Sequence, residues 1–529
     1  MQRAGANTGI AREFKDVFSL SGVPAFSQYY YFGIFIWKWI YKGFYKPWHI
    51  IPCPTIKDPT GSRELYRMNM AKAVCAEMAS LVWGEECSVN VSMNGRESSD
   101  DNPDPLNKFI QRVLSGNALR EKMQESIEQA MALGGAALKV WSEVRRDREG
   151  NEVPESRKIM IGYAMADQFI PIAWDNAKIT EGVFISRQAK GGYYYTRLEW
   201  HRWNGTTYTI TNELYRSQVT KGEQGESQDI LGVRIPLTDF YPYLEDETVI
   251  PVSESLFTYW RTPIANNLDD NSPLGMSVYG NALETLHALD ICYDSFVREF
   301  RLGRKRIIVP ARAVRSVVDP ESGKLVRYFD ATDETYEALA SDTPDDLKIQ
   351  DNSVELRVEE HVSAINAFLS ILCLQTGFSA GTFTFDQHTG LKTATEVVSE
   401  NSKTYKTIKT IQNQLAPALE HLVRSIVDVA ILYEMTDEGQ SIESLARGGY
   451  NVSITFDDGI TQDRQTNINE GVMLVGAGLL SKYTFLTDRK YGQGLTPEEA
   501  EAELERIREE NRQSIGGETI TRLFGGVGE

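Results

Sequence analysis

At 529 residues the chain is too long for one ordinary hydrophobic core, so several domains or one elongated body of several parts are expected. Apolar residues make up 41% and charged residues 24%, which is the balance of a folded protein and excludes a largely disordered one. The net charge of −19 disfavours a protein that coats nucleic acid, because coating needs surplus lysine and arginine to neutralise phosphates.

The first distinctive segment, Tyr29–Ile51, is rich in aromatic residues and isoleucine. Lys38, Lys42 and Lys46 interrupt it, whereas a membrane-spanning helix needs about 20 mostly apolar residues and tolerates charge poorly. We therefore expect a peripheral amphipathic helix that packs its aromatic side chains on a neighbour. The residues before it open polar and lack the apolar core of a secretory signal, so we expect no membrane association.

The five cysteines are scattered along the chain and form no Cys-x-x-Cys pair. We expect them to be buried, reduced thiols of a cytoplasmic protein: Cys53, Cys75, Cys87, Cys292 and Cys373. The six histidines are also isolated, without the spacing that holds a metal ion. Neither a metal nor another cofactor is expected.

The first half of the chain changes from helical to strand periodicity. Helices are predicted from Arg63 to Trp83 and from Ala118 to Leu133, the second ending at Gly134-Gly135. From about Ala136 to Trp260 the period is two, and strands are expected at Ile159–Ala164, Phe169–Trp174, Gly182–Arg187 and Tyr193–Trp203.

The clearest hairpin joins Leu198–Trp203 to Thr207–Leu214 through Asn204-Gly205. Asn-Gly adopts the positive φ angles that a tight turn needs. A β-rich half that follows a helical start is an α+β arrangement, which is the fold class we predict.

Two apolar stripes, with spacings of three and four residues, predict two long helices. The first helix is expected to begin at Ser272-Pro273, with proline at its first position, and to end at Gly303; the second ends at Gly377. About fifty polar, mostly strand-like residues lie between them. Two arrangements fit this pattern. The helices could form an antiparallel stalk with a small module at its tip, or they could be two ordinary core helices of a globular domain. The stripes are Tyr279, Ala282, Leu286, Leu289, Tyr293, Phe296 and Phe300, then Val358, Val362, Ile365, Leu369 and Leu372.

A connection rich in glycine, threonine and phenylalanine runs from Gly377 to Gly390. A very long helix is then expected from Thr393 to about Glu434, kinked at Pro417. At 1.5 Å per residue, ~40 residues reach ~60 Å, which suits an extended architecture better than a compact enzyme. Further expected elements are a strand over Tyr450–Phe456, a helix that starts at Thr496-Pro497-Glu498-Glu499, and a loose glycine-rich tail from Gly516.

The search for catalytic motifs gives one partial match. Gly377-Phe378-Ser379-Ala380-Gly381 fits the pattern of a hydrolase nucleophile elbow, but that motif needs a strand before the serine and a helix after it. Here a helix precedes and an extended segment follows, so Ser379 is not expected to be catalytic. No Gly-x-x-x-x-Gly-Lys-Ser/Thr phosphate loop occurs. We expect no enzymatic activity, and therefore no ATPase of its own.

Cations cluster where the first long helix gives way to the polar insertion. One interpretation is contact with an acidic partner or phosphate, and the other is a solvated helix end whose cations complement the helix dipole. We favour the helix end for Arg298 and Arg301, and leave both interpretations open for the denser group. That group is Arg304, Lys305, Arg306, Arg312 and Arg315.

Two stretches carry a resemblance to a known family. They are Ser272-Pro-Leu-Gly-Met-Ser-Val-Tyr-Gly through Glu299-Phe-Arg-Leu-Gly-Arg-Lys-Arg-Ile-Ile-Val-Pro310, and Gly381-Thr-Phe-Thr-Phe-Asp386 leading into Gly390–Tyr405. With the order of parts around them, they resemble the portal proteins of tailed double-stranded-DNA bacteriophages, in particular long-tailed phages of Gram-positive bacteria. The resemblance runs from the aromatic Trp37–Trp48 segment onward and is weakest after about Ser481.

The resemblance implies an elongated portal fold and a ring of twelve subunits around an axial channel. It divides the chain into a wing (1–271), stem helix 1 (272–303), a clip (304–353), stem helix 2 (354–376), a tunnel loop (377–392), a long kinked helix returning to the wing (393–460), and a crown with the C-terminal tail (461–529). The expected location is the portal vertex of the virion, with the host cytoplasm during assembly.

The resemblance also implies partners. Double-stranded DNA would pass through the lumen, and the clip cations named above would meet the terminase large subunit and later the head-completion or adaptor proteins. Major capsid and scaffolding proteins are further expected partners. The expected DNA contacts in the tunnel loop are Thr382, Thr384, Gln387, His388 and Lys392.

The acidity of the chain agrees with this function, because twelve copies of −19 give a formal −228 around a polyanion that must slide. The alternative is another minor capsid or head–tail connector protein. Such proteins need neither the two long helices flanking an insertion nor a kinked helix of this length.

Overall fold

The computed structural model describes residues 28–54, 58–84, 87–94, 104–176, 178–218, 231–303, 306–308, 315–318, 323, 325–328, 350–352, 355–385, 401–456, 471–487, 495 and 499–508. Helices and strands both contribute large parts of it, so the predicted α+β class is confirmed.

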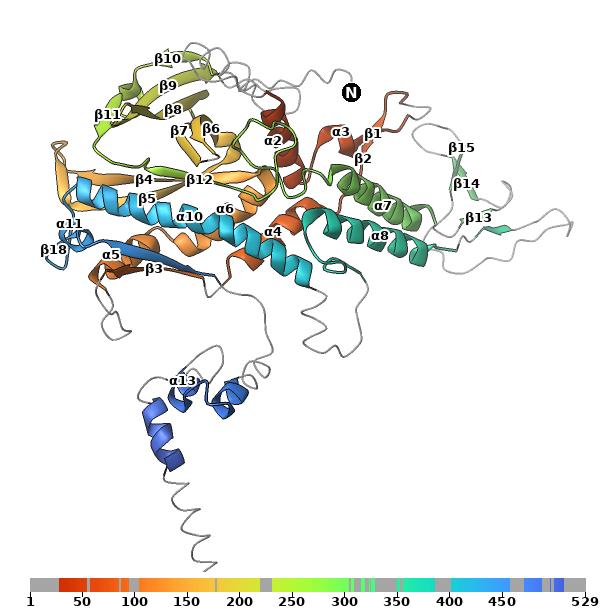
Figure 1. Cartoon of the computed structure of the whole chain (residues 1–529). Coiled ribbons are helices and arrows are strands. Elements are labelled where there is room, and N and C mark those ends of the chain that lie inside the picture. The colour runs from red at the N-terminus through yellow and green to blue at the C-terminus, as the bar shows by residue number, and fades with distance from the viewer. Residues whose placement is uncertain are drawn as a thin grey trace, which may run out of the picture.

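Two antiparallel sheets form the β-rich half (Figure 1). The larger sheet has the order β10-β9-β8-β7-β6, and β11 pairs with β9; the smaller sheet has the order β12-β4-β5. All four predicted strands lie within these sheets. The strands are β4 (Gly135–Arg146), β5 (Glu152–Met165), β6 (Phe169–Asp175), β7 (Lys178–Lys190), β8 (Tyr193–Asn204), β9 (Thr207–Gln218), β10 (Val233–Ile235), β11 (Glu247–Ile250) and β12 (Phe257–Arg261).

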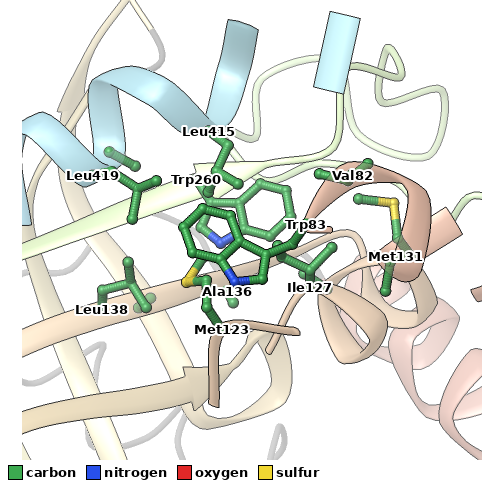
Figure 2. Packing of buried hydrophobic residues seen from close by; sticks show 14 of the residues in the cluster. Val82, Trp83, Met123, Ile127, Met131, Ala136, Leu138, Trp260, Leu415 and Leu419 are labelled. Carbon is green, nitrogen blue, oxygen red and sulfur yellow. The ribbon is translucent and has the colours of Figure 1, made fainter. Parts of the chain in front are cut away.

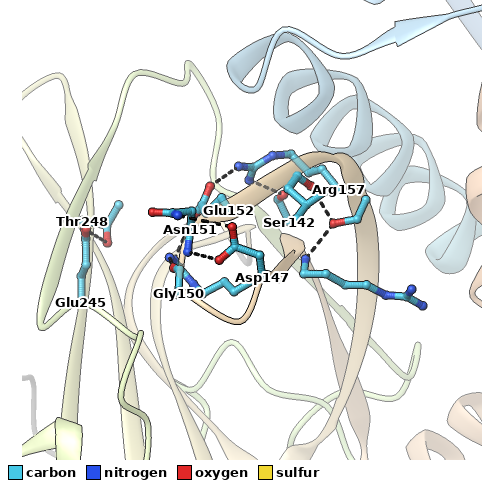
Figure 3. A network of polar contacts seen from close by, with 12 residues as sticks. Ser142, Asp147, Gly150, Asn151, Glu152, Arg157, Glu245 and Thr248 are labelled. Atoms are coloured by element: carbon cyan, nitrogen blue, oxygen red, sulfur yellow. Dashed lines mark hydrogen bonds and ion pairs between the residues drawn. The ribbon is translucent and has the colours of Figure 1, made fainter.

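Two hairpins show how local sequence sets the register. The predicted Asn-Gly hairpin is confirmed, since Asn204 pairs with Thr207 and Gly205 has a φ of +63°. At the β4–β5 turn, the Asp147 carboxylate accepts hydrogen bonds from the backbone N–H groups of Glu149 and Asn151 (Figure 3). These bonds hold the pKa of Asp147 below its usual range. The side chain of Asp147 therefore stabilises the turn by bonding to its backbone.

The main hydrophobic core lies where helices cover the smaller sheet. Helix α10 runs along β4 and β12, and α6 packs on β4 and on α4 (Figure 1). In Figure 2, Trp83, Trp260 and Leu415 meet at the centre of this core, and all three are buried. The helices are α4 (Met70–Val82), α5 (Pro105–Gly116), α6 (Leu119–Leu133) and α10 (Ser402–Leu432).

The aromatic segment forms α2 (Gln28–Tyr41), followed by α3 (Lys46–His49) and a short hairpin of β1 (Ile50–Pro52) and β2 (Ser62–Glu64). Tyr30, Ile34 and Trp37 recur at helical spacing and are at most 2% exposed. The predicted peripheral helix that packs its aromatic face is therefore confirmed. In the described part of the chain, no helix is long and apolar enough to cross a membrane.

The helix predicted over Arg63–Trp83 begins later, at Met70, so this boundary was wrong. Ser62–Glu64 pairs as a strand with Ile50–Pro52, and the next residues donate backbone N–H groups to carboxylates of another helix. These N–H groups form hydrogen bonds with distant side chains instead of the hydrogen bonds of a helix.

The first long helix, α7 (Leu283–Leu302), also begins later than predicted, about ten residues after Ser272. The intervening chain threads through the core. The carbonyl of Gly275 accepts from the hydroxyl of Tyr30 at 2.5 Å, and that of Met276 accepts from Thr262 at 2.5 Å. A Cβ on Gly275 would lie 2.3 Å from the carbonyl oxygen of Gly134, so two glycines allow the backbones to cross. Ser272-Pro273 predicted a helix start, but these tertiary contacts hold the chain in a non-helical conformation up to Ala282.

The second long helix, α8 (Val358–Thr376), has the predicted end at Gly377, whose φ is +89°, but it begins four residues after the predicted start at 354. Between α7 and α8, β13 (Arg306–Ile308) pairs with β16 (Gln350–Asn352), and β14 (Arg315–Val318) pairs with β15 (Leu325–Tyr328). The prediction of a mostly strand-like insertion is confirmed for these residues.

Helix α10 begins at Ser402, and Asn401 before it is not helical, so the prediction of one continuous helix from Thr393 was wrong at this point. The helix continues through Pro417 to Leu432, close to the predicted end. The chain then returns through β17 (Thr436–Asp437), β18 (Gln440–Ser441) and α11 (Ile442–Ala446) to β19 (Tyr450–Thr455), which confirms the predicted strand. Strand β19 pairs with β3 (Ser88–Met93) and thereby joins distant parts of the chain.

The C-terminal region contains α13 (Lys482–Thr487) and helical residues 499–508. The predicted capping box is described only at Glu499, and the predicted glycine-rich tail lies outside the described residues. All five cysteines are free, but only Cys75 and Cys373 are buried. The prediction of burial was wrong for Cys53, which is exposed, and Cys87 and Cys292 are half-buried.

Candidate functional site

Helices α7 and α8 lie side by side and antiparallel (Figure 1). The Arg357 guanidinium donates two hydrogen bonds to the Glu299 carboxylate, at 3.1 and 2.9 Å, and the ring of Phe296 lies 5.5 Å from that of His361. The hydrogen bonds from Arg357 lower the pKa of Glu299. Of the two arrangements left open by the sequence, the structure has the antiparallel pair, with the short strands of the insertion at its far end.

Two carboxylates on consecutive turns fix α7 to the end of α3 and to the segment that follows it. Asp290 accepts from the Met68 N–H at 2.8 Å and lies 3.1 Å from Nε2 of His49. Asp294 accepts hydrogen bonds from both terminal nitrogens of Arg63, at 2.7 and 2.6 Å, and from the backbone N–H of Tyr66.

Asp294 titrates below its usual range. Burial raises the pKa of this carboxyl, but the hydrogen bonds from Arg63 and from the Tyr66 N–H outweigh burial and leave the pKa lowered. Two acidic residues four positions apart beside an apolar stripe were a usable sequence signal that the sequence analysis missed.

The segment after α8, residues 377–385, is fixed to both neighbouring helices. The hydroxyl of Ser379 accepts the N–H of Thr404, in the first turn of α10, while the Ser379 N–H donates to the Thr404 hydroxyl at 2.8 Å. Lys403 donates to the carbonyl of Leu374 near the end of α8, at 2.7 Å. Each helix end thus satisfies backbone groups of the other.

The two predicted DNA contacts in this segment have hydrogen-bond partners. Thr382 donates its hydroxyl hydrogen to the Ser379 carbonyl at 2.8 Å. Thr384 lies 3.3 Å from the side-chain oxygen of Asn366 on α8, which also accepts the N–H of Phe385. The structure brings these residues together at the base of the segment. Gln387, His388 and Lys392 lie outside the described residues.

The predicted cationic group falls at and beyond the end of α7. Arg306 opens β13 and Arg315 opens β14, and only their place in the strands is described. Arg304, Lys305 and Arg312 lie outside the described residues. The structure therefore leaves both interpretations of this group open. Of the two helix-end cations, Arg301 stacks over the ring of Tyr66 at 5.1 Å.

The surroundings of Ser379 are those predicted from the sequence. A helix precedes it, no strand leads into it, and its hydroxyl is buried against Thr404. The residue therefore caps a helix and does not form a nucleophile elbow.

A buried ionic network joins the two sheets. Glu199 accepts hydrogen bonds from Lys139 and Arg197, both at 2.6 Å, and from Nε2 of His201 at 3.0 Å. Burial lowers the pKa of His201, so the ring is neutral at pH 7 and its Nδ1 accepts from the hydroxyl of Tyr208. The Nε of Arg197 is buried without a hydrogen-bond partner, while its terminal nitrogen, Lys139 and His201 all bond to Glu199. The network joins β4 to β8 and β9.

Among the described residues, no three histidine, cysteine or acidic side chains are grouped so that they could hold a metal ion. The features that remain as a candidate functional site are the antiparallel pair, its carboxylate contacts and residues 377–385 after it.

Comparison with known proteins identifies the family. The family model described as "Phage portal protein, SPP1 Gp6-like" matches residues 28–517, which include both sheets, the α7–α8 pair and α10. Comparison with curated protein sequences gives no match. Portal proteins are structural components of the phage capsid. Because the match spans almost the whole chain, this chain belongs to the SPP1 Gp6-like family of phage portal proteins.

Proposed function

We propose that the chain assembles as a ring of twelve at one capsid vertex. The ring would form the channel through which the terminase packages the genome, retain the genome afterwards, release it at ejection, and bind head-completion proteins that attach the tail. The observation that carries this proposal is the antiparallel α7–α8 pair, which holds a small β module at one end and joins the core at the other. Such a pair can repeat around an axis while the sheets extend outward.

The regions of the ring follow from this arrangement. We assign residues 1–271 to the wing, together with 393–460; the pairing of β3 with β19 supports joining these two parts. Residues 272–303 and 354–376 would form the stem, with the helical part of the first beginning at Leu283. Residues 304–353 would form the clip, 377–392 the tunnel loop, and 461–529 the crown and tail.

Within the tunnel loop we assign two roles. Thr382 and Thr384 fix the base of the loop, since their hydroxyls bond to Ser379 and Asn366. Contact with passing DNA is proposed for Gln387, His388 and Lys392, and the hydroxyl groups of Thr382 and Thr384 remain candidates for it. The few attractive contacts and the formal charge of −228 on twelve copies suit a channel in which DNA must slide.

The clip cations Arg304, Lys305, Arg306, Arg312 and Arg315 are proposed contacts of the terminase large subunit and of head-completion proteins. The other proposed partners are the capsid and scaffolding proteins around the vertex. Assembly would take place in the host cytoplasm, and the finished ring would remain in the virion.

Negative-stain microscopy of the purified chain tests the ring. Closed rings with a central hole are the expected result, whereas a uniform population of monomeric particles would overturn the proposal. Lys392→Ala combined with a shortened loop tests the DNA contact. We expect packaging and ejection to fall in infected cells, and unchanged packaging and ejection would remove that role from the loop.

A further inference from the structure

His201 lies at the contact between the larger and the smaller sheet. The residue is 1% exposed, and its ring packs edge-on against Phe184 of β7 and Phe257 of β12, with centroid distances of 5.1 and 5.3 Å. Strand β8 carries His201 in the larger sheet, and β12 lies in the smaller sheet. The imidazole is therefore a titratable group enclosed between two packed layers.

The hydrogen bonds of His201 fix which ring nitrogen carries the proton. The backbone N–H of Leu256 donates to the Tyr208 hydroxyl at 3.2 Å, and that hydroxyl lies 2.6 Å from Nδ1 of His201. The hydroxyl hydrogen therefore points to Nδ1, while Nε2 donates to Glu199 at 3.0 Å. A second ring proton, on Nδ1, would take the place of the hydroxyl hydrogen.

The charges around the ring also oppose a second proton. Lys139 on β4 and Arg197 on β8 both donate to the Glu199 carboxylate at 2.6 Å, so two cations already share one anion. Protonated His201 would add a third cation inside the protein, where an uncompensated charge is costly. Burial lowers the pKa of His201, in agreement with this geometry. The titratable groups around the ring and its partner hydroxyl are Lys139 (β4), Glu181 (β7), Arg197 and Glu199 (β8), and Tyr208 (β9).

The hydrogen-bond partners of His201 also make polar contacts between the sheets. Glu199 of the larger sheet pairs with Lys139 of the smaller one, and Tyr208 accepts the N–H of Leu256, which directly precedes β12. Tyr208 and Glu199 bond to the two nitrogens of the same ring. Protonation of that ring therefore acts on both contacts at once.

The helical core lies on the other face of the smaller sheet. Phe257 pairs with Lys139 on the face toward the larger sheet, whereas Trp260 pairs with Ala136 on the opposite face, where Figure 2 shows Trp260 near Leu415 of α10. The smaller sheet thus separates the two layers of contact. The larger sheet can move without disturbing the packing of α10.

We propose that His201 is an acid-sensitive joint between the two sheets. When the imidazole takes up a second proton, the larger sheet separates locally from the smaller one while the helical core stays folded. The open form lets water solvate the imidazolium and releases the Tyr208 hydroxyl from Nδ1. The joint lies within one subunit, so it goes beyond the proposed ring and does not depend on it.

Two neighbouring alanines can report the opening of each face. Ala137 lies on the face toward the larger sheet and Ala136 on the face toward the helices, and both are at most 2% exposed. Ala137→Cys and Ala136→Cys are therefore matched probes. Dithiodipyridine reacts with thiols in acid, and mass spectrometry of the labelled peptide from the full-length chain gives the rate at each position.

We expect the labelling rate of Ala137→Cys, relative to Ala136→Cys, to rise about thirtyfold from about pH 7.5 to about pH 5. Opening is coupled to one proton on a histidine whose pKa in the open form is about 6.5. His201→Gln in the same background should abolish the rise, because glutamine can replace both hydrogen bonds but takes up no proton. His421→Gln, which removes a histidine bonded to Ser255 beside the joint, should leave the rise unchanged.

Equal acceleration at Ala136→Cys would show general acid unfolding and overturn the joint, as would a rise that persists in His201→Gln. If these variants do not fold, hydrogen exchange of the unmodified chain gives the same test at the Leu256 amide, whose acceptor is Tyr208. After correction for the intrinsic rate, this amide should exchange faster in acid while α10 does not. Unchanged exchange at Leu256 would overturn the proposal.

Discussion

At the scale of single residues, burial decides which charged pairs stabilise the fold. The side chain of Asp294 is 5% exposed and its partner Arg63 is 24% exposed, whereas Arg357 in the Glu299 pair is 65% exposed. Ion pairs in water gain little because solvent screens them, but removing one partner of a buried pair leaves the other charge uncompensated. The two pairs on α7 have similar geometry and should differ greatly in their contribution to stability.

We predict that Asp294→Asn lowers the free energy of unfolding by about 3 kcal/mol, because Arg63 loses its anion and the Tyr66 N–H loses a charged acceptor. Arg357→Gln should lower it by less than about 1 kcal/mol, since that pair is solvated. Urea titrations of the two variants measure the difference. Equal effects would show that burial of Asp294 does not govern its contribution.

The same pair should depend on pH. The pKa of Asp294 is lower in the folded state than in the unfolded chain, so its stabilising contribution is present above the unfolded pKa of about 3.9 and is lost as the pH falls through the folded value. The stability gap between wild type and Asp294→Asn should therefore be constant from pH 6 to 8 and shrink below about pH 4. A gap that widens on acidification would contradict this sign.

His201 gives a second pH-dependent effect, in which a base is held in its neutral form. Burial keeps its ring neutral in the folded state, while the unfolded chain binds a proton below about pH 6.5, so stability should fall as the pH drops through that value. His201→Gln can donate to Glu199 and accept from Tyr208 without titrating. We predict a smaller loss of stability between pH 7 and 5 for this variant, measured by thermal unfolding.

At the scale of elements, Ser379 links α8 to α10 by capping the first turn of α10 from 25 residues away. Ser379→Ala should lower stability by about 1 kcal/mol and increase hydrogen exchange of the Thr404 amide. Thr410→Ala is the matched control, because its exposed hydroxyl bonds only within its own helix. Equal exchange in both variants would show that the cap does not hold the junction.

The crossing of Gly134 and Gly275 is the second element-scale constraint. Gly275→Ala would place a Cβ 2.3 Å from a backbone oxygen, so the two segments must separate; we expect a loss of more than about 3 kcal/mol or failure to fold. Gly116→Ala, at an exposed position at the end of α5 where a Cβ would meet no atom within 4 Å, should instead raise stability by up to about 1 kcal/mol. Thermal unfolding of the two variants distinguishes them.

The elements that the sequence predicted well are those whose signals are local. The Asn204-Gly205 hairpin and the end of α8 at Gly377 follow from backbone conformations that glycine and asparagine adopt readily. The start of α7 could not be predicted, because the bonds from Tyr30 and Thr262 that hold the preceding chain come from distant residues. The Ser379–Thr404 junction has the same long-range origin.

At the scale of the whole molecule, the features that suggest assembly are surfaces left exposed by the folded chain. The outer faces of α7 and α8 carry the exposed apolar side chains Ile291, Leu302, Ile371 and Leu374, which a self-sufficient monomer would cover. The sequence showed the buried stripes of these helices, since the buried residues dominate the periodicity, but it did not show which apolar residues stay exposed.

The most direct test of the portal assignment is a cryo-electron-microscopy reconstruction of the assembled chain without imposed symmetry. We predict a closed ring of twelve subunits in which the α7–α8 pairs surround the central channel and the two sheets lie outside them. A ring that places the pairs on the outer rim, or particles without a continuous channel, would contradict it.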